Sequence, residues 1–458
     1  MTNDRIELLG KGTISRALRT LAIPAVISML VNAIYNVVDT AFIGLLHDTA
    51  SIGAAAIVFP IFMLVGAIGL TFGMGAASDI SRKIGANQIE DACKTAATAF
   101  YTCLIVGVTF GVLGNIYIVP IMKLFGATDT ILEKSVVYGR IIITGSVFQI
   151  LNMCMNNMIR SEGAAAYSGR ALMLGGILNI VFDPIFMFVF KMGLAGAAAA
   201  TISAQFVSTI YLLRYFIMKK GIIKIHPRYF YPRTATYAAI MTIGIPTFVR
   251  QVLMSVSLGL LNSAAAHYGD AAIAAIGITM RVISIVMMVI FGIGQGLQPL
   301  AGFNYGAKQY DRVIKATHKA LSWAVTFSLC VGIIFFIFAK PVIGFFSKDV
   351  AVIEIGIKTI KFLSMTLVLV AVQNTYGILF QAIGKGLKAG LLAITRQGLF
   401  FIPLIFILPN LWGVNGVIGT QPISDALTFL LAIPMAFFQI RQLNRLKDES
   451  ENNNIRNE

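Results

Sequence analysis

Long apolar segments follow one another along almost the whole chain, from residue 17 to residue 437. Only 12% of the residues are charged, whereas a soluble globular protein carries about a quarter. A stretch of about 20 apolar residues spans the hydrocarbon of a bilayer as a helix. Outer-membrane strands would alternate apolar and polar residues, yet residues 58–70 and 333–338 are apolar throughout. The sequence therefore predicts an all-α membrane protein.

Twelve transmembrane helices are predicted, in two halves of six. The glycines Gly73 and Gly75 of the first half recur 221 residues later as Gly294 and Gly296. Because six spans is an even number, both halves enter the membrane from the same side, which predicts two six-helix lobes related by a pseudo-two-fold along the membrane normal. The predicted spans are residues 17–44, 52–81, 95–119, 136–159, 168–190, 194–217, 236–265, 272–303, 318–339, 357–380, 390–409 and 413–437.

The polar segment 218–235 divides the chain. We expect an N-terminal six-helix lobe over residues 1–217, a linker over 218–235, a C-terminal lobe over 236–440 and a polar tail over 441–458. Lys and Arg concentrate at the N-terminus, in alternate loops, in the linker and in the tail. Since basic residues mark cytoplasmic loops, linker, tail and both termini are predicted to be cytoplasmic.

The basic residues and the cysteines exclude several functional classes. The net charge of +16 is spread in short clusters between apolar segments, which favours topology marking over a nucleic-acid surface. The four cysteines show no CxxC spacing, so we interpret them as small core residues. HExxH, GxSxG and P-loop motifs are missing from the sequence, which argues against an enzyme and against ATP as an energy source.

Two acidic residues lie inside predicted spans of the first half, where an ionisable group is costly and indicates a functional site by default. In segment 1, Asp39 shares one helical face with Tyr35 and Asn36. In segment 5, Asn179 stands four residues before Asp183 and shares its face. Both segments thus carry a polar stripe that ends in a carboxylate.

The depths of these residues agree. At about 1.5 Å rise per residue, Asp39 lies about 9 Å from the outer end of its segment, and Asp183 and Thr201 lie about 10 Å from theirs. Two carboxylates with an amide and a hydroxyl suit a small hard cation such as Na⁺. A proton is the other candidate, because two buried carboxylates repel one another and favour protonation of one. The alternative is a polar core that only fixes helix packing.

Other polar residues inside predicted spans are candidates for a substrate cavity or a polar network. Arg250 and Asp425 of the second half fall at similar depths, so they are candidates for an ion pair, with a substrate role as the alternative. The full set of candidates is Tyr35, Asn36, Gln149, Asn152, Asn156, Gln205, Arg250, Arg281 and Asp425.

The order of these residues resembles the multidrug and toxic compound extrusion (MATE) transporters, and within them the bacterial MepA/DinF-like branch. The resemblance covers residues 14–440 and includes Asn179-x-x-x-Asp183-Pro184 and Gln298-Pro299-x-x-x-x-Asn304-Tyr305-Gly306-Ala307. It implies a twelve-helix fold in two lobes around a central cavity. It also implies a cation site made of Asp39, Asn179, Asp183 and Thr201, with Asn156 as a nearby polar contact.

Cation-driven export is the function that this resemblance implies. The expected substrates are structurally varied, often cationic amphipathic compounds, exchanged for H⁺ or Na⁺ across a bacterial plasma membrane, with no other cofactor. Some relatives place acidic coupling residues in segments 7 and 10, where this chain has Arg250 in one and Gln373 and Asn374 in the other. The alternative on the same fold is a flippase or exporter of a lipid-linked or other endogenous metabolite.

Overall fold

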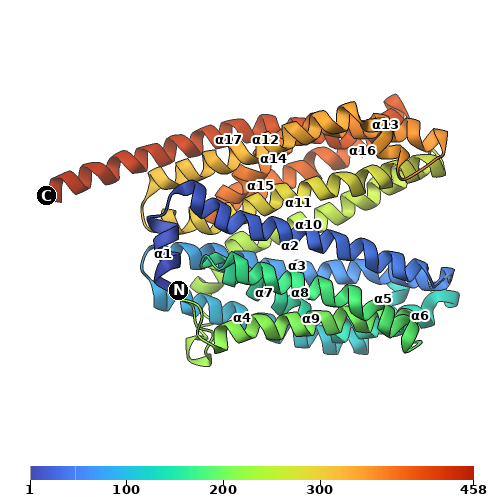
Figure 1. Ribbon diagram of the computed structural model, residues 1–458, viewed down its shortest axis with the longest axis horizontal. Helices are drawn as coiled ribbons and strands as arrows, with labels where there is room; N and C mark the ends of the chain where they lie inside the picture. The colour runs from blue at the N-terminus through green and yellow to red at the C-terminus, as the bar shows by residue number, and fades with distance from the viewer. Residues whose placement is uncertain (1, 47, 458) are drawn as a thin grey trace. The chain divides into compact units, whose positions relative to one another are not determined.

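The computed structural model describes residues 2–46 and 48–457, and it describes side chains for residues 4–35, 37–46 and 48–450. The chain is helical from end to end (Figure 1). The first half contains α1 Thr2–Gly10, α2 Ile14–Gly44, α3 Thr49–Gly85, α4 Ile89–Ile116, α5 Ile118–Leu124, α6 Asp129–Thr144, α7 Ser146–Ser161, α8 Ala165–Pro184, the π-helix η1 Ile185–Val189 and α9 Leu194–Ile217.

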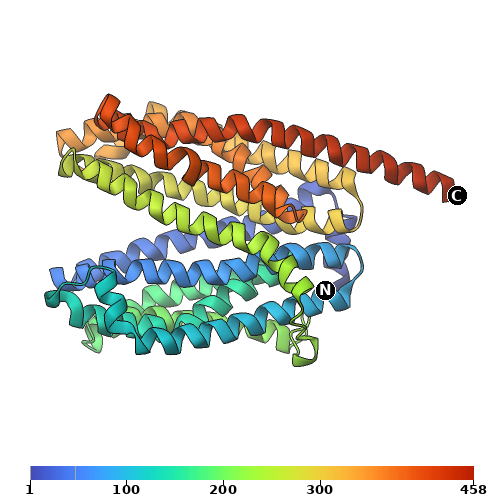
Figure 2. The ribbon, with the colours of Figure 1, turned by 180° about the vertical axis from the view of Figure 1, so that it is seen from behind.

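The second half follows after a short 3₁₀ turn. Its elements are η2 Pro227–Tyr229, α10 Thr234–Ala266, α11 Asp270–Gly306, α12 Tyr310–Ile337, α13 Ala339–Gly344, α14 Val350–Ala382, α15 Gly386–Ile394, the π-helix η3 Thr395–Phe400, α16 Phe401–Trp412 and α17 Val414–Asn457. The predicted polar tail is therefore the last part of α17, which runs on as a single helix (Figure 2).

Eleven helical segments of the described chain are long and apolar enough to cross a membrane. The bent pair of α6 and α7, which changes direction by 42°, brings the number to twelve when it counts as one span. This confirms the predicted all-α membrane fold. Asp48 and Asp349 begin two of these helices, because their carboxylates accept backbone N–H groups at the starts of α3 and α14.

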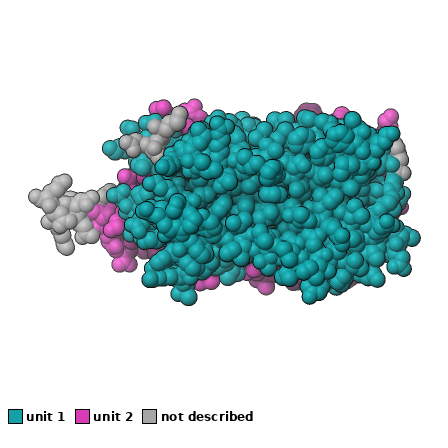
Figure 3. All heavy atoms as spheres, turned by 90° about the horizontal axis from the view of Figure 1, so that it is seen from below, with its two compact units in different colours: residues 1–11, 27–248 teal, residues 12–26, 249–458 magenta. Residues whose placement is uncertain are grey.

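The helices form two compact units, which Figure 3 colours separately. Unit 1 comprises residues 1–11 and 27–248, and unit 2 comprises residues 12–26 and 249–458. This division differs from the boundary expected at 218–235, because the start of α2 groups with unit 2 and the start of α10 groups with unit 1. Both changes of unit fall two residues after a proline inside a helix, Pro24 in α2 and Pro246 in α10.

Close approaches between helices explain this grouping. In unit 1, a Cβ added to Gly244 of α10 would lie 2.7 Å from the backbone oxygen of Thr71 in α3. In unit 2, a Cβ added to Gly296 of α11 would lie 2.7 Å from the Cα of Ala22 in α2. Small residues allow helices in a membrane to pack backbone against backbone. Gly296 and Gly75 are also glycines of the sequence repeat, and a Cβ added to Gly75 would meet the backbone oxygen of Ile240 in α10.

The basic end of unit 1 consists of α1 and residues 218–233, which lie side by side in both ribbon views. Arg5 of α1 donates hydrogen bonds to the hydroxyl of Tyr215 and to the backbone oxygen of Lys220. The carboxylate of Glu162, which is fully buried, accepts the backbone N–H groups of Ile222 at 2.6 Å and Ile223 at 3.1 Å. These contacts fix the long polar segment to the helices.

Candidate functional site

Unit 1 brings together polar residues from three spans. Asp39 lies one turn before the end of α2, Asp183 lies at the end of α8, and Thr201 lies in the second turn of α9. Asp183 is fully buried, and Asn179 on the same face of α8 is 2% exposed. The amide nitrogen of Asn179 donates a hydrogen bond of 3.2 Å to the hydroxyl of Thr201.

The two carboxylates lie within electrostatic range of each other. Asp39 acts on Asp183 as a like charge, and both act on the phenol of Tyr138 in α6. Tyr138 is a site residue that the sequence interpretation missed, because that interpretation followed amides and acids in this span. A phenol inside an apolar segment was the signal that could have revealed it.

The site is rich in oxygens that have no hydrogen-bond partner. Both carboxylate oxygens of Asp183, the Oδ1 of Asp39 and the Oδ1 of Asn179 are buried and unpartnered. Within the described chain, neither aspartate forms an ion pair with Lys, Arg or His. Buried polar groups are normally satisfied, and a buried carboxylate without a cation is costly. The arrangement is a set of acceptors that lacks a positive charge.

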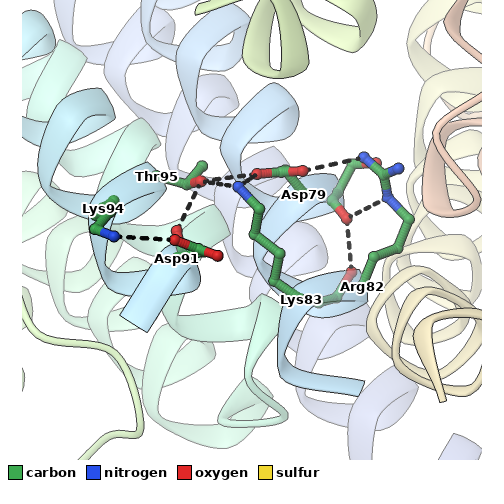
Figure 4. Close-up of polar contacts among 8 residues, drawn as sticks. Asp79, Arg82, Lys83, Asp91, Lys94 and Thr95 are labelled. Atoms are coloured by element: carbon green, nitrogen blue, oxygen red, sulfur yellow. Dashed lines mark hydrogen bonds and ion pairs between the residues drawn. The ribbon is translucent and has the colours of Figure 1, made fainter. Parts of the chain in front are cut away.

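A third buried aspartate of unit 1 shows the contrast. Asp79, near the end of α3, is 6% exposed and forms ion pairs with Lys83 at 2.6 Å and with Arg82 at 3.5 Å. The hydroxyl of Thr95 donates a further hydrogen bond to it at 2.7 Å (Figure 4). This carboxylate has its own cations and joins α3 to α4. Burial alone therefore does not distinguish the pair formed by Asp39 and Asp183; the lack of a cation does.

The backbone of α8 changes its hydrogen bonding next to Asp183. Pro184 has no N–H, and the helix continues beyond it as the π-helix η1. The turn of η1 packs closely on α9, since a Cβ added to Gly196 would lie 2.7 Å from the carbonyl of Phe186. The π-helix thus begins two residues after Asp183, the most deeply buried carboxylate of the site.

The amides predicted in segment 4 form hydrogen bonds with neighbouring helices. Asn152 donates to the hydroxyl of Ser208 at 2.8 Å, and Asn156 donates to the backbone oxygen of Ser168 at 2.9 Å. Gln149 donates to the backbone oxygen of Phe62 at 3.3 Å, while its own Oε1 is buried without a partner. These bonds join α7 to α9, α8 and α3.

The remaining candidates of the first half lie on α2 and α9. A Cβ added to Gly176 of α8 would lie 3.4 Å from the ring of Tyr35, and Gln205 is half-buried one turn after Thr201. Asn36 belongs to α2, but its side chain lies outside the described residues. Tyr35 thus holds α2 against the helix that carries Asp183.

The second half forms an ion pair different from the one expected. Asp425 of α17, 2% exposed, pairs with Arg396 of η3 at 2.7 Å and not with Arg250. Arg396 falls within the predicted span 390–409 but was not among the candidate residues; the structure places it in η3, inside the helical segment that runs from Gly386 to Trp412. Arg250 lies near Arg396 as a like charge, and Arg281 is exposed on α11.

The oxygens of unit 1 define which ions the site could hold. Among the described residues, no three His, Cys, Asp or Glu side chains gather into a metal-binding group. The candidate ligands for Na⁺ are instead mixed: the carboxylates of Asp39 and Asp183, the amide oxygen of Asn179 and the hydroxyl of Thr201. Oxygen donors of this kind suit a hard cation or a proton.

Comparison with known proteins connects this geometry to a family. The MatE family model matches residues 24–185 and again residues 246–407. The two matches begin 222 residues apart, close to the offset of the internal repeat.

Individual relatives match over nearly the whole chain. The multidrug export protein MepA of Staphylococcus aureus is 28% identical over 443 residues, which cover 95% of this chain and 96% of that protein. The protein of the same name from Staphylococcus saprophyticus is 28% identical over 439 residues, with the same coverage. A solved outward-facing structure of a multidrug resistance MATE family transporter is similar with a TM-score of 0.90 and 27% identity, covering 96% of this chain and 98% of that chain.

Proposed function

The chain belongs to the MatE family of transporters, and on that premise we propose that it is a secondary antiporter that exports amphipathic, often cationic compounds in exchange for H⁺ or Na⁺. Membership in this family makes it a multi-pass membrane transporter and not an enzyme. The relatives named above are multidrug exporters, which supports a polyspecific substrate range.

One observation carries the coupling part of the proposal. Asp39, Asp183 and Asn179 each have a buried oxygen without a hydrogen-bond partner, and Asp39 lies close enough to Asp183 to act on it as a like charge. A monovalent cation or a proton supplies the missing positive charge. Because both carboxylates act electrostatically on the phenol of Tyr138, that side chain experiences the change in their charge. Asp79 of the same unit, in contrast, forms an ion pair with Lys83, as expected for a carboxylate with a structural role.

Binding at this site is coupled to export through differential affinity. A cation that binds Asp39 and Asp183 stabilises the conformation in which α2, α8 and α9 hold their oxygens together. If substrate binds that conformation less tightly, cation entry drives substrate release, and thermodynamics requires nothing more. The energy then comes from an ion gradient, and ATP is not needed.

The proposed orientation follows from charge. The basic end of unit 1 and the end of α17, with Arg441, Arg445 and Lys447, face the cytoplasm of a bacterial cell because basic residues remain on that side. Asp39 and Thr201 then lie in the half of the membrane that faces outward, where an external cation arrives first.

The test uses the purified chain in lipid vesicles with ethidium as the transported probe. A pH gradient and a Na⁺ gradient are imposed separately, and ethidium movement is followed by fluorescence. We expect one of the two gradients to drive ethidium against its concentration difference. If neither gradient does so, the proposal is wrong, and movement of lipid-linked headgroups without ethidium transport would support the flippase alternative.

A further inference from the structure

Unit 2 contains a partly buried basic cluster that the cation site of unit 1 does not use. We define this cluster as Arg250 of α10, Arg396 and Gln397 of η3, Gln373 of α14 and Asp425 of α17. A hydrogen bond of 2.8 Å from Ser257 to the backbone oxygen of Gln397 joins α10 to η3. Another of 2.6 Å from Ser424 to the backbone oxygen of Arg396 joins α17 to η3.

The charges of the cluster do not cancel. Asp425 compensates Arg396, whose Nε donates to its Oδ1 at 2.7 Å, and Gln421 donates to the same oxygen at 2.9 Å. Arg250 stands close enough to Arg396 to act on it as a like charge, and no second carboxylate of the described chain pairs with either guanidinium. Two cations and one anion leave one positive charge inside the membrane-spanning part of unit 2.

Arg250 lacks the partners that other arginines of the chain have. Its Nε is buried without a hydrogen-bond partner, and its guanidinium has no hydrogen bond to any described residue. The buried Arg160, by contrast, donates to the amide oxygen of Asn157, and Arg312 donates to Asn304 and to the backbone oxygen of Gly12. A buried donor without a partner is costly, and a bound anion would supply the acceptor that the described helices do not provide.

One arginine of the cluster is partly exposed. The side chain of Arg396 is 23% exposed, although its partner Asp425 is 2% exposed. Only the Nε of Arg396 is used in the ion pair, so its two terminal nitrogens remain available as donors. Gln373 and Gln397 each have a buried amide oxygen without a partner, and these acceptors suit an ammonium or hydroxyl group next to the anion.

We propose that Arg250 and Arg396 bind the carboxylate of a zwitterionic amphipathic substrate. A guanidinium presents donors in a planar fork that matches the two oxygens of a carboxylate. The bound anion would neutralise the excess charge of the cluster and satisfy Arg250. This inference deepens the proposed export function and rests on it for the identity of the ligand as a substrate.

The test compares two ligands that differ only in this group. Nε-dansyl-lysine carries an α-ammonium and a carboxylate, and its methyl ester keeps the ammonium but has no anion. Both are titrated by dansyl fluorescence against the purified full chain in a nonionic detergent without any ion gradient. Wild-type protein should bind the acid about tenfold more tightly than the ester.

Substitutions of Arg250 test whether this side chain binds the carboxylate or only supports the fold. Arg250→Gln should abolish the preference for the acid and change the affinity for the ester by less than about twofold. Arg250→Lys, which keeps the charge but loses the fork, should retain part of the preference. Arg441→Gln, at an exposed arginine of α17, is the matched control and should leave the preference unchanged.

Several results would overturn the proposal. One is wild-type protein that binds the acid no more tightly than the ester, and another is a preference that survives Arg250→Gln. A lower unfolding temperature for Arg250→Gln would assign Arg250 to the structure instead, since removing an unpaired buried charge should not destabilise the fold. Because no gradient is present, failure of ion-driven export would leave this binding result unaffected.

Discussion

The amide nitrogen of Asn179 donates a hydrogen bond to the hydroxyl of Thr201, and this bond leaves the amide oxygen of Asn179 as a buried acceptor without a partner. The bond joins α8 to α9 at the level of the acid pair. The bond therefore orients the amide group of Asn179, whose oxygen adds an acceptor to the carboxylates of Asp39 and Asp183. The first prediction concerns this bond.

Thr201→Val removes the hydroxyl but keeps the shape of the side chain. The loss of one hydrogen bond costs about 1 kcal/mol, so the cation concentration that gives half-maximal ethidium export should rise roughly fivefold. Vesicles with graded H⁺ or Na⁺ gradients measure this shift. Thr242→Val, at an exposed threonine whose hydroxyl bonds only within its own helix, is the control. An unchanged cation dependence in Thr201→Val would remove Thr201 from the site.

Gly196→Ala tests the packing of the π-helix beside the site. The added methyl group would meet the backbone of Phe186 at 2.7 Å, and backbone atoms cannot move aside as a flexible side chain can. We expect a loss of about 1–3 kcal/mol in the free energy of unfolding. Gly277→Ala, where a Cβ would meet nothing within 4 Å, should be neutral or stabilising. Thermal unfolding of both variants in detergent makes the comparison, and equal stabilities would contradict it.

The ion pair of Arg396 and Asp425 should behave as a coupled unit. Asp425 is buried, so removing Arg396 leaves its carboxylate without its ion-pair partner, and Arg396→Gln should cost about 3 kcal/mol of stability. Asp425→Asn should also destabilise, and the double variant should recover part of the loss. Denaturant unfolding of the four proteins gives the coupling free energy. Strictly additive losses would show that the pair does not act as one.

Glu162, at the basic end of unit 1, should make the stability of the fold depend on pH. Burial raises the pKa of the Glu162 carboxyl above its usual value, against the opposing effects of the Tyr215 hydroxyl and of two backbone N–H groups. The folded chain therefore keeps this proton over a pH interval in which the unfolded chain has released it, and stability falls as pH rises through that interval.

Glu162→Gln removes that proton and should flatten the dependence. Unfolding temperatures recorded from about pH 4.5 upward should fall more steeply in wild type than in Glu162→Gln. Glu133→Gln, at an exposed glutamate of α6, should follow wild type. Parallel curves for wild type and Glu162→Gln would refute this account of the basic end.

The sequence predicted the spans, the internal repeat and the acid residues of the first half, because each of these is a local signal. Hydropathy marks spans, and a carboxylate inside a span is visible without any knowledge of packing. The position of Asp39 and of Asp183 within their helices was enough to predict one depth for both.

Partners across the fold could not be predicted in the same way. Arg250 was the candidate partner of Asp425 because the two fall at similar depths, yet in the structure Asp425 pairs with Arg396, which lies in the π-helix η3. Tyr138 was passed over because its contact with the acids comes from the packing of α6. The grouping of α2 and α10 with opposite units likewise follows from contacts of Gly244 and Gly296, which no pattern in one helix reveals.

The central claim is that the carboxylates of Asp39 and Asp183 couple cation entry to export. The most direct test measures the uphill accumulation of ethidium in vesicles that contain wild type, Asp39→Asn, Asp183→Asn or the exposed control Asp129→Asn, and the binding of ethidium to each protein in detergent. Wild type and Asp129→Asn should concentrate ethidium under the imposed gradient. The two site variants should lose that accumulation by at least about tenfold, while their binding of ethidium in detergent persists. Undiminished accumulation in Asp39→Asn and Asp183→Asn would contradict the account.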